Sequence, residues 1–171
     1  MRQSVVKEPK KRSAEEALVS LMRLCARAEK SSGDARRLMR GWGVEPAAQE
    51  SVLRQLIAQR FIDDERYAAA FVREKVNLSG WGAYKIRAAL ARKGIEERII
   101  NAALQNIDSA KSAEQLSQRL QRKMRTTKAA SEYELKTKLM RYGVSLGYDF
   151  ETVREAVDAL IKTTDERCDI F

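Results

Sequence analysis

Three glycines in similar surroundings divide this chain into units of about fifty residues. Gly43, Gly94 and Gly143 each follow a stretch rich in Leu, Met, Arg and Lys, and each precedes Val or Ile. They lie 51 residues apart from position 43 to 94 and 49 residues apart from 94 to 143. Each stands where a helix is expected to stop, because glycine adopts the left-handed conformation after a C-cap at little steric cost. The spacing predicts stacked repeats that share cores, since a single unit of this size is marginal on its own.

Apolar residues at helical spacing predict three short helices in each unit. Capping boxes at Ser13–Glu16 and Ser131–Glu134 mark two helix starts, and residues 77–82 are expected to form a turn. The expected inner faces carry Leu18, Leu21, Leu24, Cys25, Val52, Leu53, Leu56 and Ile57 in the first unit, Tyr67, Phe71, Val72, Ile86, Ala89, Leu90, Ile99, Ile100, Ala103 and Leu104 in the second, and Leu116, Leu120, Met124, Leu135, Leu139, Phe150, Val153, Val157 and Leu160 in the third.

The predicted fold class is all-α, with three tandem three-helix repeats that form an elongated, curved array. Residues 1–12 are expected to be a basic disordered arm, followed by repeat 1 at 13–60, repeat 2 at 61–107, repeat 3 at 108–162 and a flexible tail at 163–171. Only 8 Gly and 2 Pro occur in 171 residues, fewer turn residues than a strand-rich protein needs. The alternative is one irregular helical domain whose self-similarity arose by chance.

The residue types present argue against several classes of enzyme. The chain has no histidine, which excludes Ser-His and Cys-His nucleophilic sites, and its two cysteines form no CxxC pair. Asp63, Asp64 and Glu65 begin a helix, where carboxylates cap amides, so capping is favoured over metal binding. We therefore expect no enzymatic activity, cofactor or metal. The absence of a signal-peptide pattern and of a long apolar run predicts a cytoplasmic protein without membrane contact.

A net charge of +9 indicates an acidic partner, with nucleic acid the first candidate. Recurring basic faces on stacked helices suit a phosphate backbone, although the same residues also fit a plain solvated surface or an acidic protein partner. Trp42, Trp81 and Tyr84 are candidates for base stacking, with packing favoured for Trp81 and Trp42 undecided. The candidate surface comprises Arg73, Lys75, Lys85, Arg87, Arg92, Lys93, Arg119, Arg122, Lys123, Arg125, Lys136, Lys138 and Arg141.

The middle unit resembles the signature of the RecX family of recombination regulators. The similar elements, in order, are residues 61–68 (FIDDERYA), Phe71, Gly80-Trp81-Gly82, Lys85-Ile86-Arg87, Leu90 and Lys93-Gly94-Ile95. The likeness extends from about residue 17 to 160 and is strongest in this middle unit.

The resemblance implies tandem three-helix repeats and a non-enzymatic role. It implies a modulator, mainly an inhibitor, that binds in the groove of the RecA–DNA filament and restrains ATP hydrolysis and strand exchange. The expected partners are the RecA filament and, mostly through it, single- and double-stranded DNA, with the chain acting as a monomer. Two alternatives stay open, a generic basic helical DNA-binding protein and a helical-repeat adaptor for proteins.

Overall fold

The computed structural model describes residues 11–168, with side chains described for residues 11–162, and these residues are helical without strands. Repeat 1 contains α1 (Ala14–Arg27), α2 (Ser32–Gly41) and α3 (Pro46–Ala58). Repeat 2 contains α4 (Asp64–Glu74), the π-helical turn η1 (Lys75–Ser79), α5 (Ala83–Arg92) and α6 (Glu97–Gln105). Repeat 3 contains α7 (Ser109–Thr126), α8 (Glu132–Ser145) and α9 (Phe150–Cys168). The predicted all-α class is confirmed.

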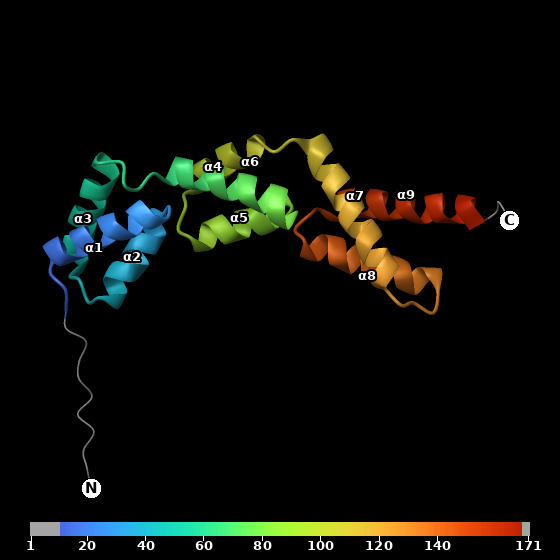
Figure 1. Cartoon of the computed structure of the whole chain (residues 1–171), viewed down its shortest axis with the longest axis horizontal. Helices are drawn as coiled ribbons and strands as arrows, with labels where there is room; N and C mark the ends of the chain where they lie inside the picture. Colours follow the sequence, from blue (N-terminus) through green and yellow to red (C-terminus); the bar gives the residue numbers. More distant parts are fainter. Residues whose placement is uncertain (1–10, 169–171) are drawn as a thin grey trace, which may run out of the picture.

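The three repeats follow one another along the long axis of the molecule (Figure 1). Each has a hydrophobic core of its own: the first includes Leu21 and Leu56, the second Ile86 and Ile100, the third Leu120 and Val157. The expectation that stacked repeats share cores is therefore wrong. The hydrophobic cores end at each repeat, so the repeats must be joined by other contacts.

Local signals in the sequence account for most helix starts. The capping box at Ser13 and Glu16 is complete. At α8, Ser131 accepts from the Glu134 amide, whereas the Glu134 carboxylate accepts from the Ala130 amide and not from that of Ser131. Only half of the second predicted box is therefore present, although the carboxylate still satisfies a free amide before the helix.

The left-handed glycines end the second helix of each repeat. Gly43 and Gly94 have φ values of 69° and 74°, as the sequence predicts. In repeat 3 this role falls to Gly147, at φ 93°, and Gly143 lies inside α8. The expectation for Gly143 is wrong because its lack of a side chain serves packing: a Cβ there would lie 2.5 Å from Val153 Cγ1. The helix thus continues past the glycine that the repeat spacing singles out.

Most of the predicted inner-face residues are buried or partly buried, but two are not. The side chains of Ile57 and Phe150 are 49% and 64% exposed. Residues 77–79, expected in a turn, belong to η1, and the chain reverses only at Gly80, which has φ 59°. The π-turn absorbs extra residues between α4 and α5 without breaking the helical path.

Both predicted termini carry some structure at their inner ends. Arg12, assigned to the arm, donates its backbone amide to Trp42 O at 3.0 Å and stacks on the Trp42 ring. The backbone of residues 163–168, assigned to the tail, continues α9. Ile62, assigned to repeat 2, lies in the first core. The remaining arm and tail positions, 1–10 and 169–171, lie outside the described residues. No helix in the described part of the chain is long and apolar enough to cross a membrane.

Candidate functional site

Repeats 1 and 2 meet where the N-terminus of α2 abuts the C-terminal end of α5. Ser31, the N-cap of α2, accepts from the Asp34 amide and donates its hydroxyl to Lys93 O, both at 3.0 Å. Ser32 donates its amide and its hydroxyl to the Asp64 carboxylate, at 2.8 and 2.5 Å. A Cβ on Gly33 would lie 2.0 Å from Lys93 O, so only glycine permits this approach. We call this contact the first joint.

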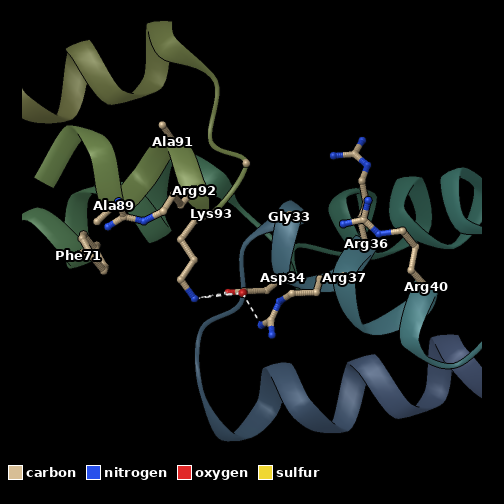
Figure 2. A pocket seen from close by; sticks show the side chains of 11 residues that line it. Gly33, Asp34, Arg36, Arg37, Arg40, Phe71, Ala89, Ala91, Arg92 and Lys93 are labelled. Atoms are coloured by element: carbon tan, nitrogen blue, oxygen red, sulfur yellow. Dashed lines mark hydrogen bonds and ion pairs between the residues drawn. The ribbon is translucent and has the colours of Figure 1, made fainter. Parts of the chain in front are cut away.

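The first joint also contains a buried carboxylate. The Asp34 side chain is 7% exposed and binds Lys93 Nζ at 3.0 Å and Arg37 Nη2 at 2.9 Å (Figure 2). Burial alone raises the pKa of Asp34, but the hydrogen bonds from Lys93 and Arg37 outweigh it and the pKa is lowered. Burial likewise opposes ionisation of Lys93, yet the hydrogen bond that its ammonium donates to Asp34 raises its pKa. Both groups are therefore charged at neutral pH.

Repeats 2 and 3 meet in an equivalent way through main-chain bonds, at what we call the second joint. The Gly82 amide donates to Leu146 O at 2.8 Å, and the Tyr84 amide donates to Gly147 O at 3.0 Å. A Cβ on Gly82 would lie 2.3 Å from Gly147 O, so a glycine is again required on the approaching helix. The second helices α2, α5 and α8 thus form a head-to-tail row along one side of the array (Figure 1).

The same acceptor position is used at the three left-handed glycines that follow the second helices, Gly43, Gly94 and Gly147. In each case the carbonyl of the residue before the glycine accepts a hydrogen bond from an earlier part of the chain. Lys93 O accepts from Ser31, Leu146 O from Gly82 and Trp42 O from Arg12. The acceptor at Trp42 is therefore filled by Arg12, where the other two are filled by a neighbouring repeat.

A basic pocket of about 550 Å³ opens beside the first joint. Arg36 and Arg37 line it from α2, and Figure 2 shows Lys93 and Arg37 reaching Asp34 from opposite sides. Of the lining side chains, Asp34 is the one acid. The residues that line the pocket are Gly33, Asp34, Arg36, Arg37, Arg40, Phe71, Ala89, Ala91, Arg92, Lys93 and Gly94.

The pocket cations differ in how strongly the protein already holds them. Arg36 is paired with Glu50 at 3.0 Å, and Arg37 and Lys93 share Asp34. Arg40 and Arg92 are exposed, and their guanidinium groups make no hydrogen bond or ion pair within the described residues. The pocket therefore presents two free guanidinium groups next to three cations that are partly neutralised.

Sequence and structure comparisons identify the chain's relatives. Models of the second and third three-helix domains of RecX match residues 63–104 and 111–157. A "Regulatory protein RecX" of Prosthecochloris aestuarii is 32% identical over 133 residues, which cover 78% of this chain and 85% of that protein. The chain belongs to the RecX family of regulatory proteins.

Other RecX proteins are longer or more distant. The Halalkalibacterium halodurans "Regulatory protein RecX" is 33% identical over 68% of this chain, but the match spans only 44% of that protein. A crystal structure of regulatory protein RecX superposes with a TM-score of 0.78 at 23% identity, over 85% of this chain and 71% of that one. RecX from Lactobacillus salivarius superposes at 0.77 with 17% identity, over 86% and 96%. These structures share the fold of three-helix repeats.

The cations predicted from the sequence differ in whether the structure already pairs them. Arg92 and Lys93 line the pocket, and Arg73, Arg122, Arg125 and Arg141 are exposed without a described partner. Lys123 is exposed above the Tyr142 ring. The others are engaged: Lys75 with Glu74, Lys85 with Ser145 O, Arg87 with Glu97, Arg119 with Leu78 O, Lys136 with Asp158 and Lys138 with Glu134.

Three of those engaged side chains contact other segments of the fold. Lys85 donates to Ser145 O at 3.0 Å across the second joint, and its ammonium lies 4.8 Å from the centre of the Trp81 ring. Arg119 covers Gly80, where a Cβ would lie 1.8 Å from its Nε, and donates to Leu78 O. Lys75 also lies above Trp81, which packs edge-on against Phe71, so the packing expected for Trp81 is confirmed.

Sequence reasoning missed Arg36, Arg37 and Arg40. Their spacing at i, i+1 and i+4 after Asp34 was a readable sign of a basic helix face. The first unit departs from the family pattern at this helix, which hid that sign. The pocket itself had no local signature, because its lining residues come from positions 33–40, 71 and 89–94 of the chain. Trp42 packs on the first core under Arg12, while Tyr84 is 63% exposed.

Among the described residues, no group of three or more His, Cys, Asp or Glu side chains is placed to hold a metal ion. What the site offers is a concave, positively charged surface. Such a surface binds anions through guanidinium and ammonium groups.

Proposed function

We propose that this chain regulates the RecA recombinase by lying in the groove of the RecA–DNA filament and restraining ATP hydrolysis and strand exchange. Membership of the RecX family supports this role. The observation that carries the proposal is an elongated array (Figure 1) whose three repeats all carry cations without a partner among the described residues, such as Arg40, Arg92 and Arg141. A filament presents DNA phosphates over many subunits, and such a spread of cations matches an extended target better than a compact one.

The mechanism follows from length and from the joints. Repeats seated on successive RecA subunits would occupy the groove that a second DNA molecule must enter, which blocks homologous pairing. Hydrogen bonds and close glycine contacts join the repeats to one another. A chain bound across several RecA subunits would therefore restrain the movement of those subunits relative to one another and slow ATP turnover. The chain needs no catalytic group for this, since it acts by occupying and bridging.

A generic basic DNA-binding protein is the second candidate, favoured by the net charge of +9. A protein of that kind would inhibit RecA only by competing for DNA. Excess free DNA would then relieve the inhibition. A helical-repeat adaptor that binds protein alone would bind with little dependence on salt, whereas phosphate contacts weaken steeply as salt rises.

The test is the single-stranded-DNA-dependent ATPase rate of the cognate RecA protein, titrated with this chain. We expect suppression at near-stoichiometric or lower amounts that persists when free DNA is added in excess. Unchanged ATPase activity, or inhibition abolished by free DNA, would contradict a filament regulator.

A matched pair of variants sharpens this test. R122Q/R125Q/R141Q removes three cations that have no described partner, whereas R87Q/K136Q/K138Q removes three that are already paired with carboxylates. Both variants lose the same net charge. We expect the first variant to inhibit more weakly than the parent, because it loses cations that are available to a partner. We expect the second to resemble the parent, because exposed ion pairs contribute little to folding and a cation already paired with a carboxylate attracts a partner only weakly. Equal inhibition by both variants would remove repeat 3 from the interface.

A further inference from the structure

The pocket between α2 and α5 concentrates positive charge around one buried acid. Five cations line it from two repeats, and the single lining carboxylate belongs to Asp34. We propose that this pocket binds a DNA phosphodiester, and that Asp34 is a resident counter-ion that the phosphate displaces from Lys93 and Arg37. The inference deepens the proposed function, on which it rests for the presence of DNA.

The geometry suits an anion that arrives from solvent. Arg40 and Arg92 stand free on opposite walls, so an entering phosphate meets two guanidinium groups before it reaches the Asp34 cluster. Guanidinium forks bind phosphate oxygens through paired hydrogen bonds, and a concave site strengthens the field of the charges that line it. The first contacts therefore require no existing ion pair to break.

The shape of the rim favours a nucleic-acid strand over a protein side chain. Gly33 and Gly94 line the pocket where the backbones of the two repeats touch, because a Cβ on Gly33 would lie 2.0 Å from Lys93 O. Phe71, Ala89 and Ala91 add an apolar wall suited to the sugar of a nucleotide. A volume of about 550 Å³ admits a phosphate with its neighbouring sugar, whereas a single Asp or Glu side chain on a folded surface would fill little of it.

Asp34 occupies the position that a bound phosphate would compete for. Its oxygens lie 3.0 Å from Lys93 Nζ and 2.9 Å from Arg37 Nη2, and neither cation is buried: their side chains are 37% and 68% exposed. Both can therefore turn from the carboxylate to a ligand in the pocket. In this structure Asp34 forms ion pairs with both cations and neutralises part of their charge.

Neutralising Asp34 tests this role. In D34N the amide keeps the volume, and the backbone bond from residue 34 to Ser31 remains. Two cations are then released to the phosphate in the pocket, so we expect tighter binding of oligothymidylate and a steeper dependence on salt, by up to about 0.7 in the logarithmic slope. If Asp34 only positions the cations for a ligand, D34N binds more weakly, and the counter-ion assignment is wrong.

The binding experiment uses the full chain without recombinase. Fluorescence anisotropy of a labelled oligothymidylate is measured over a series of KCl concentrations. R40Q/R92Q is the test variant, with glutamine chosen because both arginines lie in the last turns of their helices, where a negative charge would be unfavourable. R23Q/R54Q is the control, because these two exposed arginines on α1 and α3 lie outside the pocket.

We expect R40Q/R92Q to lose about 0.7 from the salt slope, as the loss of one phosphate contact on a single strand requires, and to bind several-fold more weakly. The control should keep most of the parental affinity, with circular dichroism showing equal helix content in all variants. Equal DNA binding by both double variants would overturn the pocket site.

The recombinase assay separates this inference from the proposed function. If R40Q/R92Q binds DNA like the control but loses ATPase inhibition, the pocket contacts an acidic RecA surface, so the DNA assignment fails while the regulator survives. If R40Q/R92Q loses DNA binding and the parent has no effect on RecA, the pocket stands and the proposed function fails.

Discussion

Gly33 and Gly41 lie in the same short helix but have opposite surroundings. A Cβ on Gly33 would lie 2.0 Å from Lys93 O, whereas a Cβ on Gly41 would meet nothing within 4 Å. G33A should therefore lower the free energy of unfolding by about 1 to 3 kcal/mol, a usual cost of overpacking. G41A should be neutral or stabilising by up to about 1 kcal/mol, because alanine loses less entropy in a helix. Urea denaturation followed by circular dichroism measures both, and equal effects would show that the first joint tolerates a side chain.

The roles of some single residues could be predicted from the sequence, whereas the roles of others could not. The sequence predicts the roles of Ser13, Asp63 and Gly94, because helix capping and left-handed turns depend on residues within a few positions in the chain. The closeness of Gly33 to Lys93 has no such local sign. It follows from how two repeats stack, and the same is true of Asp34 in the pocket.

The pairing of α8 with α9 depends on Gly143, which the repeat spacing had marked as a helix end. Its absent side chain leaves room for Val153, which is fully buried. A glycine in mid-helix weakens the helix by about 1 kcal/mol relative to alanine, so its presence requires a packing reason. The close approach of the two helices supplies that reason.

A double-mutant cycle tests this contact between elements. G143A should destabilise the chain by about 1 to 3 kcal/mol through overpacking. V153A alone should also destabilise, by leaving a cavity, but G143A/V153A should cost less than the two single changes added together. Thermal unfolding of the four proteins gives the coupling. Additive losses would indicate that Gly143 and Val153 do not compete for the same space.

At the level of elements, the sequence predicted where helices occur better than how they end. Hydrophobic periodicity depends only on which face meets the core, and it correctly placed Ile86 and Leu139 inside. It failed for Ile57 and Phe150, whose side chains are exposed although core residues precede and follow each of them in the chain. The π-turn after α4 was also missed, because an added residue in a helix leaves little mark on a short apolar pattern.

For the whole molecule, the two joints differ in the kind of bond that holds them. The first joint contains the ion pairs Asp34–Lys93 and Glu29–Arg66, whereas main-chain hydrogen bonds dominate the second. Salt screens partly exposed charges far more than it affects amide–carbonyl bonds. The array should therefore loosen first between repeats 1 and 2.

Amide hydrogen exchange at low and high KCl measures this difference. On going from about 0.1 M to 1 M salt, where the screening length falls from about 10 to 3 Å, exchange of the Ser32 amide should accelerate. Exchange of the Gly82 and Tyr84 amides should change much less. Equal acceleration at both joints would indicate that the ion pairs do not control the opening.

The head-to-tail row of α2, α5 and α8 also has an electrical consequence. At each joint the positive end of one helix dipole meets the negative end of the next, so the partial charges offset each other there. The three short helices then behave as one long dipole, with its poles at the start of α8 and the end of α2. The chain places compensating charges at these poles, Glu132 and Glu134 at the first and Arg40 with Arg12 at the second. The row of three helices thus has acidic side chains at its N-terminal end and basic side chains at its C-terminal end, as favours a single helix.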